Sequence, residues 1–264
     1  MGRRRLDAEL VRRGLAASRS QAREAVSAGR VTVAGITTTK AASLVADDAP
    51  VALSGPAPSF VSRGGDKLAA ALDRFAVAPA GRDCLDAGAS TGGFTDCLLQ
   101  RGAARVIAVD VGYGQLSWSL RTDPRVTVME RTNVRDLTSS MLAYVPNLLV
   151  ADLSFISLRL VLPVLAKLAG PAATFVVLVK PQFEAGRAHV GRGGVVRDPD
   201  VWRSALWGVF EAARSASLEP LNVMASPLPG PAGNVEFPLH LAAGSPPSPV
   251  DLDGAVGEGE ALLR

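Results

Sequence analysis

From about residue 84 onward, short apolar runs alternate with segments long enough to form helices, and this alternation restricts the possible folds most strongly. The predicted strands are residues 84–86, 106–109, 126–129, 147–151 and 174–179. The predicted helices are residues 94–99, 116–120, 157–168 and 201–216. Consecutive strands joined by helices form βαβ units, so we expect an α/β fold with a parallel sheet covered on both faces. Two final strands, near residues 221–225 and 235–241, predict an antiparallel edge.

The first part of the chain has the pattern of a separate, smaller α+β domain. Leu6, Leu10 and Leu15 have helical spacing, and a second short helix is expected to begin at an N-cap, Ser18, and to stop at Gly29. Short strands are expected at 31–33 and 51–53. The expected boundaries are 1–53 for the small domain, 54–62 for a linker, 63–243 for the large domain and 244–264 for a frayed tail.

Charge is unevenly distributed between the two parts. Residues 1–60 carry nine Lys and Arg against five Asp and Glu, whereas the remaining residues carry nineteen against twenty. A basic module attached to a nearly neutral body is typical of a domain that binds a polyanion. On charge alone, a solvated helix face explains the same imbalance equally well.

Composition excludes several classes of protein. Apolar residues make up 48% of the chain, as in globular proteins. No uninterrupted apolar run reaches the roughly 20 residues that a membrane helix requires. The two cysteines are too few for a disulfide framework, and no group of cysteine and histidine has the spacing of a zinc site. We therefore expect a cytoplasmic protein with no membrane span and no metal.

A glycine-rich loop links the first predicted strand of the large domain to the helix that follows. Its core reads Asp86-x-Gly88-x-x-x-Gly92, and Asp110 ends the next strand, 22 residues after Gly88. Glycines at this turn let a ligand approach the backbone, and an acid at the end of the second strand can bind ribose hydroxyls. An acid at the first loop position would repel a pyrophosphate but suits a cationic amino-acid moiety. The loop therefore favours S-adenosylmethionine over a dinucleotide.

Four charged residues occur at strand ends and loop positions where packing alone would not favour them. Asp152 and Lys180 each end a predicted strand, Lys67 lies at the start of the helix before the sheet, and Glu236 lies on the final strand. Carboxyl ends of parallel strands line the ligand crevice of a doubly wound sheet, so Asp152 and Lys180 should converge beside the glycine loop.

These four residues resemble the K-D-K-E pattern of the FtsJ-like ribose 2′-O-methyltransferases. The chain is more similar still to the TlyA family of bacterial rRNA cytidine-2′-O-methyltransferases, some of which are labelled haemolysins. The stretches that carry the resemblance are 62–64, 85–95, 110–115, 151–158, 180–184 and 225–236, with 5–7, 18–19 and 29–31 in the small domain. One departure is Phe60, where the linker of this family often has a tryptophan.

The resemblance implies a Rossmann-like class I methyltransferase sheet with an N-terminal S4-type RNA-binding domain. It implies methyl transfer from S-adenosylmethionine to a cytidine 2′-hydroxyl in 16S or 23S rRNA, or both, with 30S and 50S ribosomal subunits as partners. The catalytic residues would be Lys67, Asp152, Lys180 and Glu236. The donor-binding residues would be Asp86, Gly88, Ser90, Gly92, Asp110 and Asn133. The RNA-binding residues would be Arg4, Arg5, Arg19, Arg23, Arg30 and Arg63.

Chemistry assigns roles within this set. A ribose hydroxyl is a weak nucleophile, so the enzyme must align it with the methyl group and either remove its proton or stabilise the developing alkoxide. Lys180 is the candidate for both roles, and Asp152 and Glu236 would orient the lysines. A non-catalytic rRNA-binding or ribosome-assembly factor on a methyltransferase fold is the alternative function, and a dinucleotide-dependent oxidoreductase is the enzymatic rival.

Overall fold

The structure is a computed structural model that describes residues 2–16, 19–55 and 58–263. It divides into two compact units, which we call unit 1 (Met1–Ser59) and unit 2 (Phe60–Arg264). Ser18, the expected N-cap, lies outside the described residues.

Unit 1 consists of two short helices and two small sheets. The helices are α1 (Leu6–Arg12) and α2 (Arg19–Ser27). One sheet has the order β3 (Ile36–Thr37), β2 (Val31–Val33), β5 (Val51–Leu53), and the other pairs β1 (Arg3–Arg5) with β4 (Leu44–Ala46). Its core consists of small and medium apolar side chains, chiefly Leu6, Leu10, Ala22, Val26, Val31 and Val45. The α+β character expected from the sequence is therefore present.

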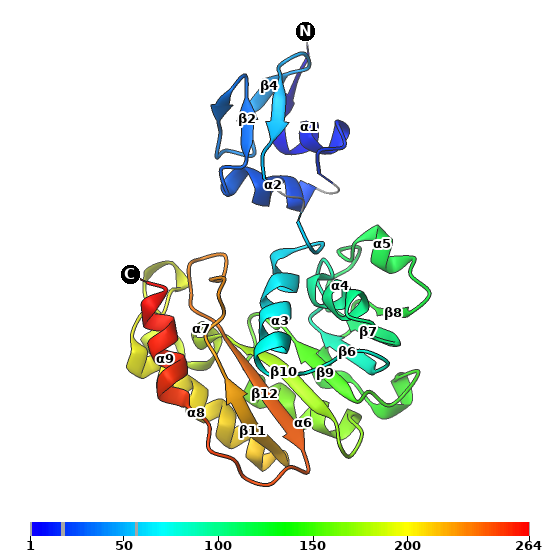
Figure 1. Cartoon of the computed structure of the whole chain (residues 1–264), viewed down its shortest axis with the longest axis vertical. Helices are drawn as coiled ribbons and strands as arrows, with labels where there is room; N and C mark the ends of the chain where they lie inside the picture. Colours follow the sequence, from blue (N-terminus) through cyan, green and yellow to red (C-terminus); the bar gives the residue numbers. More distant parts are fainter. Residues whose placement is uncertain (1, 17–18, 56–57, 264) are drawn as a thin grey trace. The chain divides into compact units, whose positions relative to one another are not determined.

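Unit 2 is built on a seven-stranded sheet (Figure 1). In spatial order the strands are β11 (Leu218–Val223), β12 (Phe237–Ala243), β10 (Thr174–Val179), β9 (Leu148–Ala151), β6 (Asp83–Ala87), β7 (Arg105–Val109) and β8 (Val126–Met129). The five strands from β10 to β8 are parallel, β12 runs antiparallel to β10, and β11 runs antiparallel to β12. The expected parallel sheet with an antiparallel edge is confirmed.

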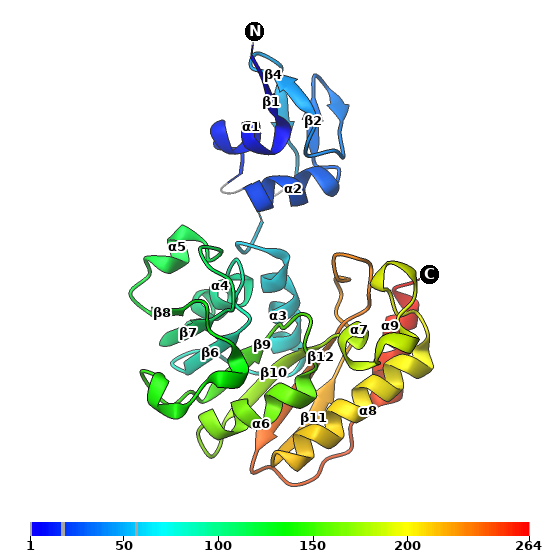
Figure 2. The ribbon, with the colours of Figure 1, turned by 180° about the vertical axis from the view of Figure 1, so that it is seen from behind.

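Helices cover both faces of this sheet, because successive strand residues are apolar on both sides. Leu85 and Leu149 belong to the core on one face, whereas Cys84 and Leu148 belong to the core on the other. Figure 1 shows one covered face, and the reverse view in Figure 2 shows the other. The helices on the first are α3 (Arg63–Arg74), α4 (Gly93–Gln100) and α5 (Trp118–Arg121), and those on the second are α6 (Leu158–Leu168) and α8 (Pro199–Ser215). Helix α9 (Leu252–Ala261) packs on α8 and contributes to the second core.

Several short helices lie in the loops. They are α7 (Pro181–Glu184) and the 3₁₀ helices η1 (Val134–Asp136), η2 (Ser139–Met141), η3 (Arg187–His189) and η4 (Arg192–Gly194). The chain leaves β6 toward β7 on one side and returns to β9 on the other. The carboxyl ends of β6 and β9 therefore meet at a topological switch point, which is where ligands bind in open α/β sheets.

The expectation of a frayed tail over 244–264 is wrong for its second half, which forms α9. Ala255 and Val256 are buried in the core, and Gly259 packs closely against Trp202 and Phe237. The several glycines of this segment weaken its intrinsic helix propensity, so tertiary packing decides the outcome.

Two strand boundaries also differ from expectation. Strand β11 begins three residues before the predicted start at 221, and β12 begins at Phe237 rather than 235. Glu236 therefore lies just before the final strand and not within it. Among the described residues, no helix is both long and apolar enough to cross a membrane.

Candidate active site

The glycine-rich loop turns sharply between β6 and α4. Gly88 has a φ of +88°, and a Cβ at this position would lie 2.5 Å from the carbonyl oxygen of Asp152. Gly92, the residue that precedes α4, has a φ of +98°, and a Cβ there would collide with Leu116 and Leu120. Both positions need a left-handed backbone and a minimal side chain, so glycine is required at each.

Asp110 is fixed by this loop. One oxygen of its carboxylate accepts a hydrogen bond from the Ser90 backbone N–H at 2.8 Å, and the other accepts from Gly112 N–H at 2.6 Å. Ser90 has a φ of +48°, which turns its N–H toward Asp110. Each carboxylate oxygen can accept a further bond, so Asp110 is oriented and still able to bind hydroxyl groups.

A cavity of about 750 Å³ opens beside the loop, at the switch point of the sheet. Five predicted residues line it, namely Gly88, Ser90, Asp110, Asn133 and Asp152. Asn133 also precedes η1, where its side-chain oxygen accepts a hydrogen bond from Arg135 N–H at 3.0 Å. Its oxygen therefore has a local capping role in addition to its position on the cavity wall.

Asp86 has no exposed surface and is not among the residues that line the cavity. Its Oδ2 accepts a hydrogen bond from Thr95 Oγ1 at 2.6 Å, and its Oδ1 is buried without a hydrogen-bond partner among the described residues. Burial raises the pKa of the Asp86 carboxyl to about 7; the Thr95 bond opposes this, and the charges of Asp152 and Asp110 add to it. The carboxyl group is thus a buried polar support of the loop.

Lys180 and Asp152 meet at the carboxyl ends of β10 and β9. Lys180 Nζ lies 2.6 Å from Asp152 Oδ1 and donates a hydrogen bond to Ser154 Oγ at 3.0 Å. The Lys180 side chain is only 11% exposed. The expected convergence of these two residues beside the glycine loop is present, and Ser154 is a further polar neighbour that the sequence pattern did not single out.

Lys67 and Glu236 form a second lysine–carboxylate pair. Lys67 Nζ lies 2.5 Å from Glu236 Oε2, and both side chains are buried. Antiparallel pairing of β10 with β12 places Val179 opposite Phe237, so Lys180 and Glu236 follow at the next step of the same ladder. Helix α3, which carries Lys67, packs on these two strands. The four predicted catalytic residues therefore belong to one end of the sheet.

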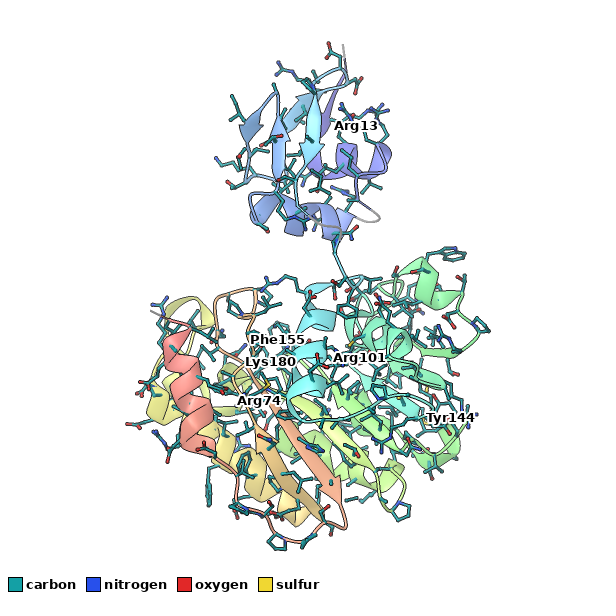
Figure 3. The ribbon with its side chains drawn as sticks, viewed as in Figure 1. Arg13, Arg74, Arg101, Tyr144, Phe155 and Lys180 are labelled. Carbon is teal, nitrogen blue, oxygen red and sulfur yellow. The ribbon has the colours of Figure 1, made fainter. Side chains whose placement is uncertain are left out.

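An aromatic side chain on the cavity wall, in the loop after β9, was not predicted. Phe155 is 91% exposed, has a φ of +63° and lines the cavity. Its ring centroid lies 5.2 Å from that of Phe183, and the preceding residue, Ser154, accepts a hydrogen bond from Lys180. Figure 3 labels Phe155 and Lys180 in unit 2. A bulky residue in the left-handed region with its ring in solvent is strained and unburied, which points to a functional use. Only its position in the 151–158 stretch indicated it in the sequence.

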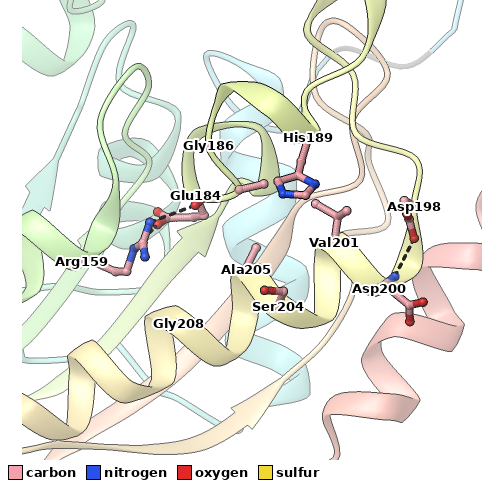
Figure 4. Close-up of a pocket in the computed structure, with 11 residues that line it drawn as sticks. Arg159, Glu184, Gly186, His189, Asp198, Asp200, Val201, Ser204, Ala205 and Gly208 are labelled. Carbon is pink, nitrogen blue, oxygen red and sulfur yellow. Dashed lines mark hydrogen bonds and ion pairs between the residues drawn. The ribbon is translucent and has the colours of Figure 1, made fainter.

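A second cavity, of about 550 Å³, lies beside α8 and contains none of the predicted residues (Figure 4). On its wall, Arg159 points toward Glu184, with 3.4 Å between Nε and Oε2. Glu184 is buried and also accepts hydrogen bonds from Ser157 Oγ at 2.5 Å and Leu158 N–H at 2.7 Å. It thereby ties α7, which directly follows Lys180, to the start of α6.

The predicted RNA-binding arginines all have partners. In unit 1, Arg5, Arg19 and Arg23 contact Asp7, Arg4 contacts Asp47, and Arg30 donates a hydrogen bond to the Ser54 carbonyl. In unit 2, Arg63 donates to the Pro229 carbonyl at 2.6 Å. The five predicted RNA-binding arginines of unit 1 are therefore held by acids or backbone carbonyls of that unit.

Comparison with known proteins supports the family resemblance that the sequence motifs indicate. Residues 60–243 match the FtsJ-like methyltransferases, and residues 4–49 match the S4 domain. The 16S/23S rRNA (cytidine-2′-O)-methyltransferase TlyA of Mycobacterium tuberculosis is 55% identical over 240 residues, which cover 90% of each chain. Hemolysin A of Brachyspira hyodysenteriae is 38% identical over 238 residues, 90% of this chain and 99% of that one.

A solved structure of a hemolysin-named protein from Streptococcus thermophilus is 38% identical, with a TM-score of 0.81 over 100% of this chain and 98% of that chain. The resemblance drawn from the sequence motifs is therefore confirmed, both for the large domain and for the small one. The chain belongs to the TlyA family of FtsJ-like methyltransferases.

Proposed function

We propose that this protein transfers a methyl group from S-adenosylmethionine to the ribose 2′-hydroxyl of a cytidine in 16S or 23S rRNA, or both. The observation that carries the proposal is the pair of lysine–carboxylate contacts, Lys180–Asp152 and Lys67–Glu236, at the carboxyl edge of the sheet. The 55% identity to a methyltransferase named for this reaction supports the choice of substrate. The 30S and 50S particles that contain such RNA are cytoplasmic, so we expect the protein to act there.

The residues of the cavity fit the proposed donor. Gly88 lines the cavity with bare backbone, and Asp110 is oriented to bind ribose hydroxyls. Gly92 is not among the lining residues and serves the turn into α4, where a Cβ would collide with Leu116 and Leu120. Asp86 would support the loop beside the cationic amino-acid moiety, and Ser90 and Asn133 line the cavity wall. When bound, S-adenosylmethionine supplies an electrophilic methyl group on its sulfonium.

Lys180 acts on the acceptor hydroxyl in this proposal. Asp152 and Ser154 hold its Nζ at the end of a buried strand, which fixes the position of the amine with little freedom. Asp152 Oδ1 is buried against the lysine, whereas the Asp152 side chain as a whole is 25% exposed and lines the cavity. The other carboxylate oxygen can therefore accept a hydrogen bond from the substrate hydroxyl. The amine either receives the hydroxyl proton or stabilises the alkoxide as a cation.

Phe155 supplies a surface for the target nucleotide. A base must leave its stacked neighbours before its ribose can reach Lys180, and an aromatic ring at the mouth of the cavity replaces part of the lost stacking. Phe155 is 91% exposed, follows Ser154 in the chain and packs its ring against that of Phe183, so its ring is available for stacking. This assigns to Phe155 the binding of a base and not the packing of a core.

Radiolabelled methyl transfer to unmodified 30S and 50S particles tests the proposal. We expect label on at least one particle with the wild type, mapping to a cytidine 2′-oxygen, and a loss of at least 100-fold in turnover for Lys180→Ala. Lys167→Ala, on the distant end of α6, is the matched control and should retain full activity. Absence of label on both particles despite donor binding would overturn the proposal in favour of a non-catalytic RNA-binding factor.

A further inference from the structure

Asp7 is a buried acid inside the most basic part of the chain. Its side chain has no exposed surface, and it lies on α1, in the segment where residues 1–40 carry nine Lys and Arg against three Asp and Glu. A carboxylate in such a segment lowers the local positive charge, so it works against polyanion binding unless it has another purpose.

Three arginines from two elements converge on this carboxylate. Arg5 donates two hydrogen bonds, at 3.1 and 3.0 Å, from the end of β1. Arg19 and Arg23 donate from α2, at 3.0 and 3.3 Å. The bonds from Arg5 first, and then those from Arg19 and Arg23, lower the pKa of Asp7 against the opposing effect of burial. The carboxylate therefore stays ionised while three guanidinium groups surround it.

The three arginines remain accessible although their ends are held together. Their side chains are 47%, 51% and 57% exposed for Arg5, Arg19 and Arg23. Three cations around one anion leave a local excess of positive charge. Each guanidinium has five N–H donors in a rigid fork, so donors remain for an oxyanion from solvent.

A neighbouring acid on the same helix shows that this arrangement is not general. Glu9 is also buried and binds Arg12 and Arg13. Arg13, however, is only 21% exposed and donates further hydrogen bonds to the carbonyls of Ala49 and Asp47. Arg13 thus ties α1 to the turn before β5, and only Arg12, which is 50% exposed, is left facing outward at Glu9. At Asp7 all three arginines face outward.

We propose that Asp7 is a positioning residue that gathers Arg5, Arg19 and Arg23 into one binding site for the phosphodiester backbone of the rRNA substrate. The inference rests on the proposed function, because it takes rRNA as the ligand of unit 1. Phosphate oxygens are the fitting partner, because guanidinium forks bind them in bidentate fashion and RNA presents them at regular intervals. Without Asp7 the three flexible side chains repel one another and lose this common orientation.

Asp7→Asn in the full chain tests the inference, because two explanations predict opposite changes in RNA affinity. Simple electrostatics predicts tighter RNA binding, since a negative charge is removed. Positioning predicts binding about ten-fold weaker and a slope of log Kd against log salt reduced by about 1. The matched control is Asp47→Asn, which removes a 44% exposed carboxylate beside the single Arg4. The control should bind as tightly as the wild type or more tightly.

The measurement is filter binding of unmodified 30S and 50S particles between 50 and 300 mM KCl. Unchanged or tighter binding by Asp7→Asn, with the wild type binding normally, overturns the inference and leaves the proposed function intact. Failure of the wild type to bind either particle overturns the proposed function instead. Thermal unfolding followed by circular dichroism identifies any variant that has lost its fold. The salt slope is compared only at temperatures below the unfolding transition of each variant.

A second set of variants keeps the inference testable if Asp7→Asn does not fold. Arginines that share one phosphate site are energetically coupled. The loss of RNA affinity in double variants among Arg5→Gln, Arg19→Gln and Arg23→Gln should therefore be smaller than the product of the losses in the single variants. Arg4→Gln, which belongs to a different ion pair, should combine with Arg19→Gln multiplicatively within a factor of about two. Multiplicative losses for all pairs among the three would contradict a common site.

Discussion

At the scale of single residues, the clearest departure from ordinary behaviour is the buried carboxyl of Asp86. Its pKa is raised to about 7, chiefly by burial. A carboxyl group whose pKa is higher in the folded state than in the unfolded state stabilises the fold below its unfolded pKa, and this contribution is lost as the pH rises toward the folded value. The relevant window therefore runs from about pH 4 to about pH 7.

We expect the free energy of unfolding of unit 2 to fall with rising pH in that window, relative to Asp86→Asn, by at most about 1.4 kcal/mol per pH unit. Urea unfolding followed by tryptophan fluorescence measures it cleanly, because all three tryptophans of the chain, Trp118, Trp202 and Trp207, lie in unit 2. Parallel pH profiles for the two proteins would show that Asp86 is ionised in both states and contradict the prediction.

A second prediction concerns the stability contributed by the ion pair Lys67–Glu236, in which both side chains are buried. Glu236→Ala leaves a lysine without its counter-charge, which should cost about 3–5 kcal/mol in the free energy of unfolding. Lys67→Met combined with Glu236→Leu removes both charges and should recover most of that loss. Urea unfolding compares the variants, and methyl transfer should be lost in both. Recovery of activity along with stability would mean that the pair serves the fold alone.

At the scale of elements, α9 shows how packing overrides composition. A Cβ on Gly259 would lie 3.1–3.2 Å from Trp202, Val235 and Phe237, whereas one on Gly257 would meet nothing within 4 Å. Gly259→Val should therefore destabilise unit 2 by about 1–3 kcal/mol through overpacking. Gly257→Ala should stabilise it by about 0.5–1 kcal/mol, because alanine loses less backbone entropy in a helix. The midpoints of urea unfolding measure both changes in stability. Equal effects of the two substitutions would mean that α9 does not pack on α8.

The strands of the sheet could be predicted from the sequence because each is a short apolar run buried on both faces. Asp152 and Lys180 could be predicted as site residues for the same reason, since they end such strands. Phe155 and Ser154 could not, because their importance depends on a turn that brings them to Lys180. The partners of the arginines could not either, because Asp7 meets Arg19 and Arg23 only when α1 and α2 pack together.

At the scale of the whole molecule, the distribution of charge separates the two tasks that the proposed function requires. Residues 1–60 have nine basic and five acidic residues, and the remainder have nineteen and twenty. The donor cavity lies entirely within unit 2 and is lined by more acidic than basic side chains. Binding of RNA should therefore depend strongly on salt, and binding of the donor should not.

We expect the KM for ribosomal particles to rise about ten- to one hundred-fold between 50 and 200 mM KCl, as a few phosphate contacts are screened. The Kd for S-adenosylmethionine, measured by calorimetry, should change by less than about two-fold, because the ligand carries little net charge. Arg74→Gln and Arg203→Gln, which remove exposed arginines of unit 2, should leave the salt slope of KM unchanged. Arg19→Gln should reduce that slope by about 1 without changing kcat, because its guanidinium lies in the basic unit and outside the donor cavity. A KM that is insensitive to salt in the wild type would mean that shape and base contacts, rather than the charge of unit 1, hold the RNA in place.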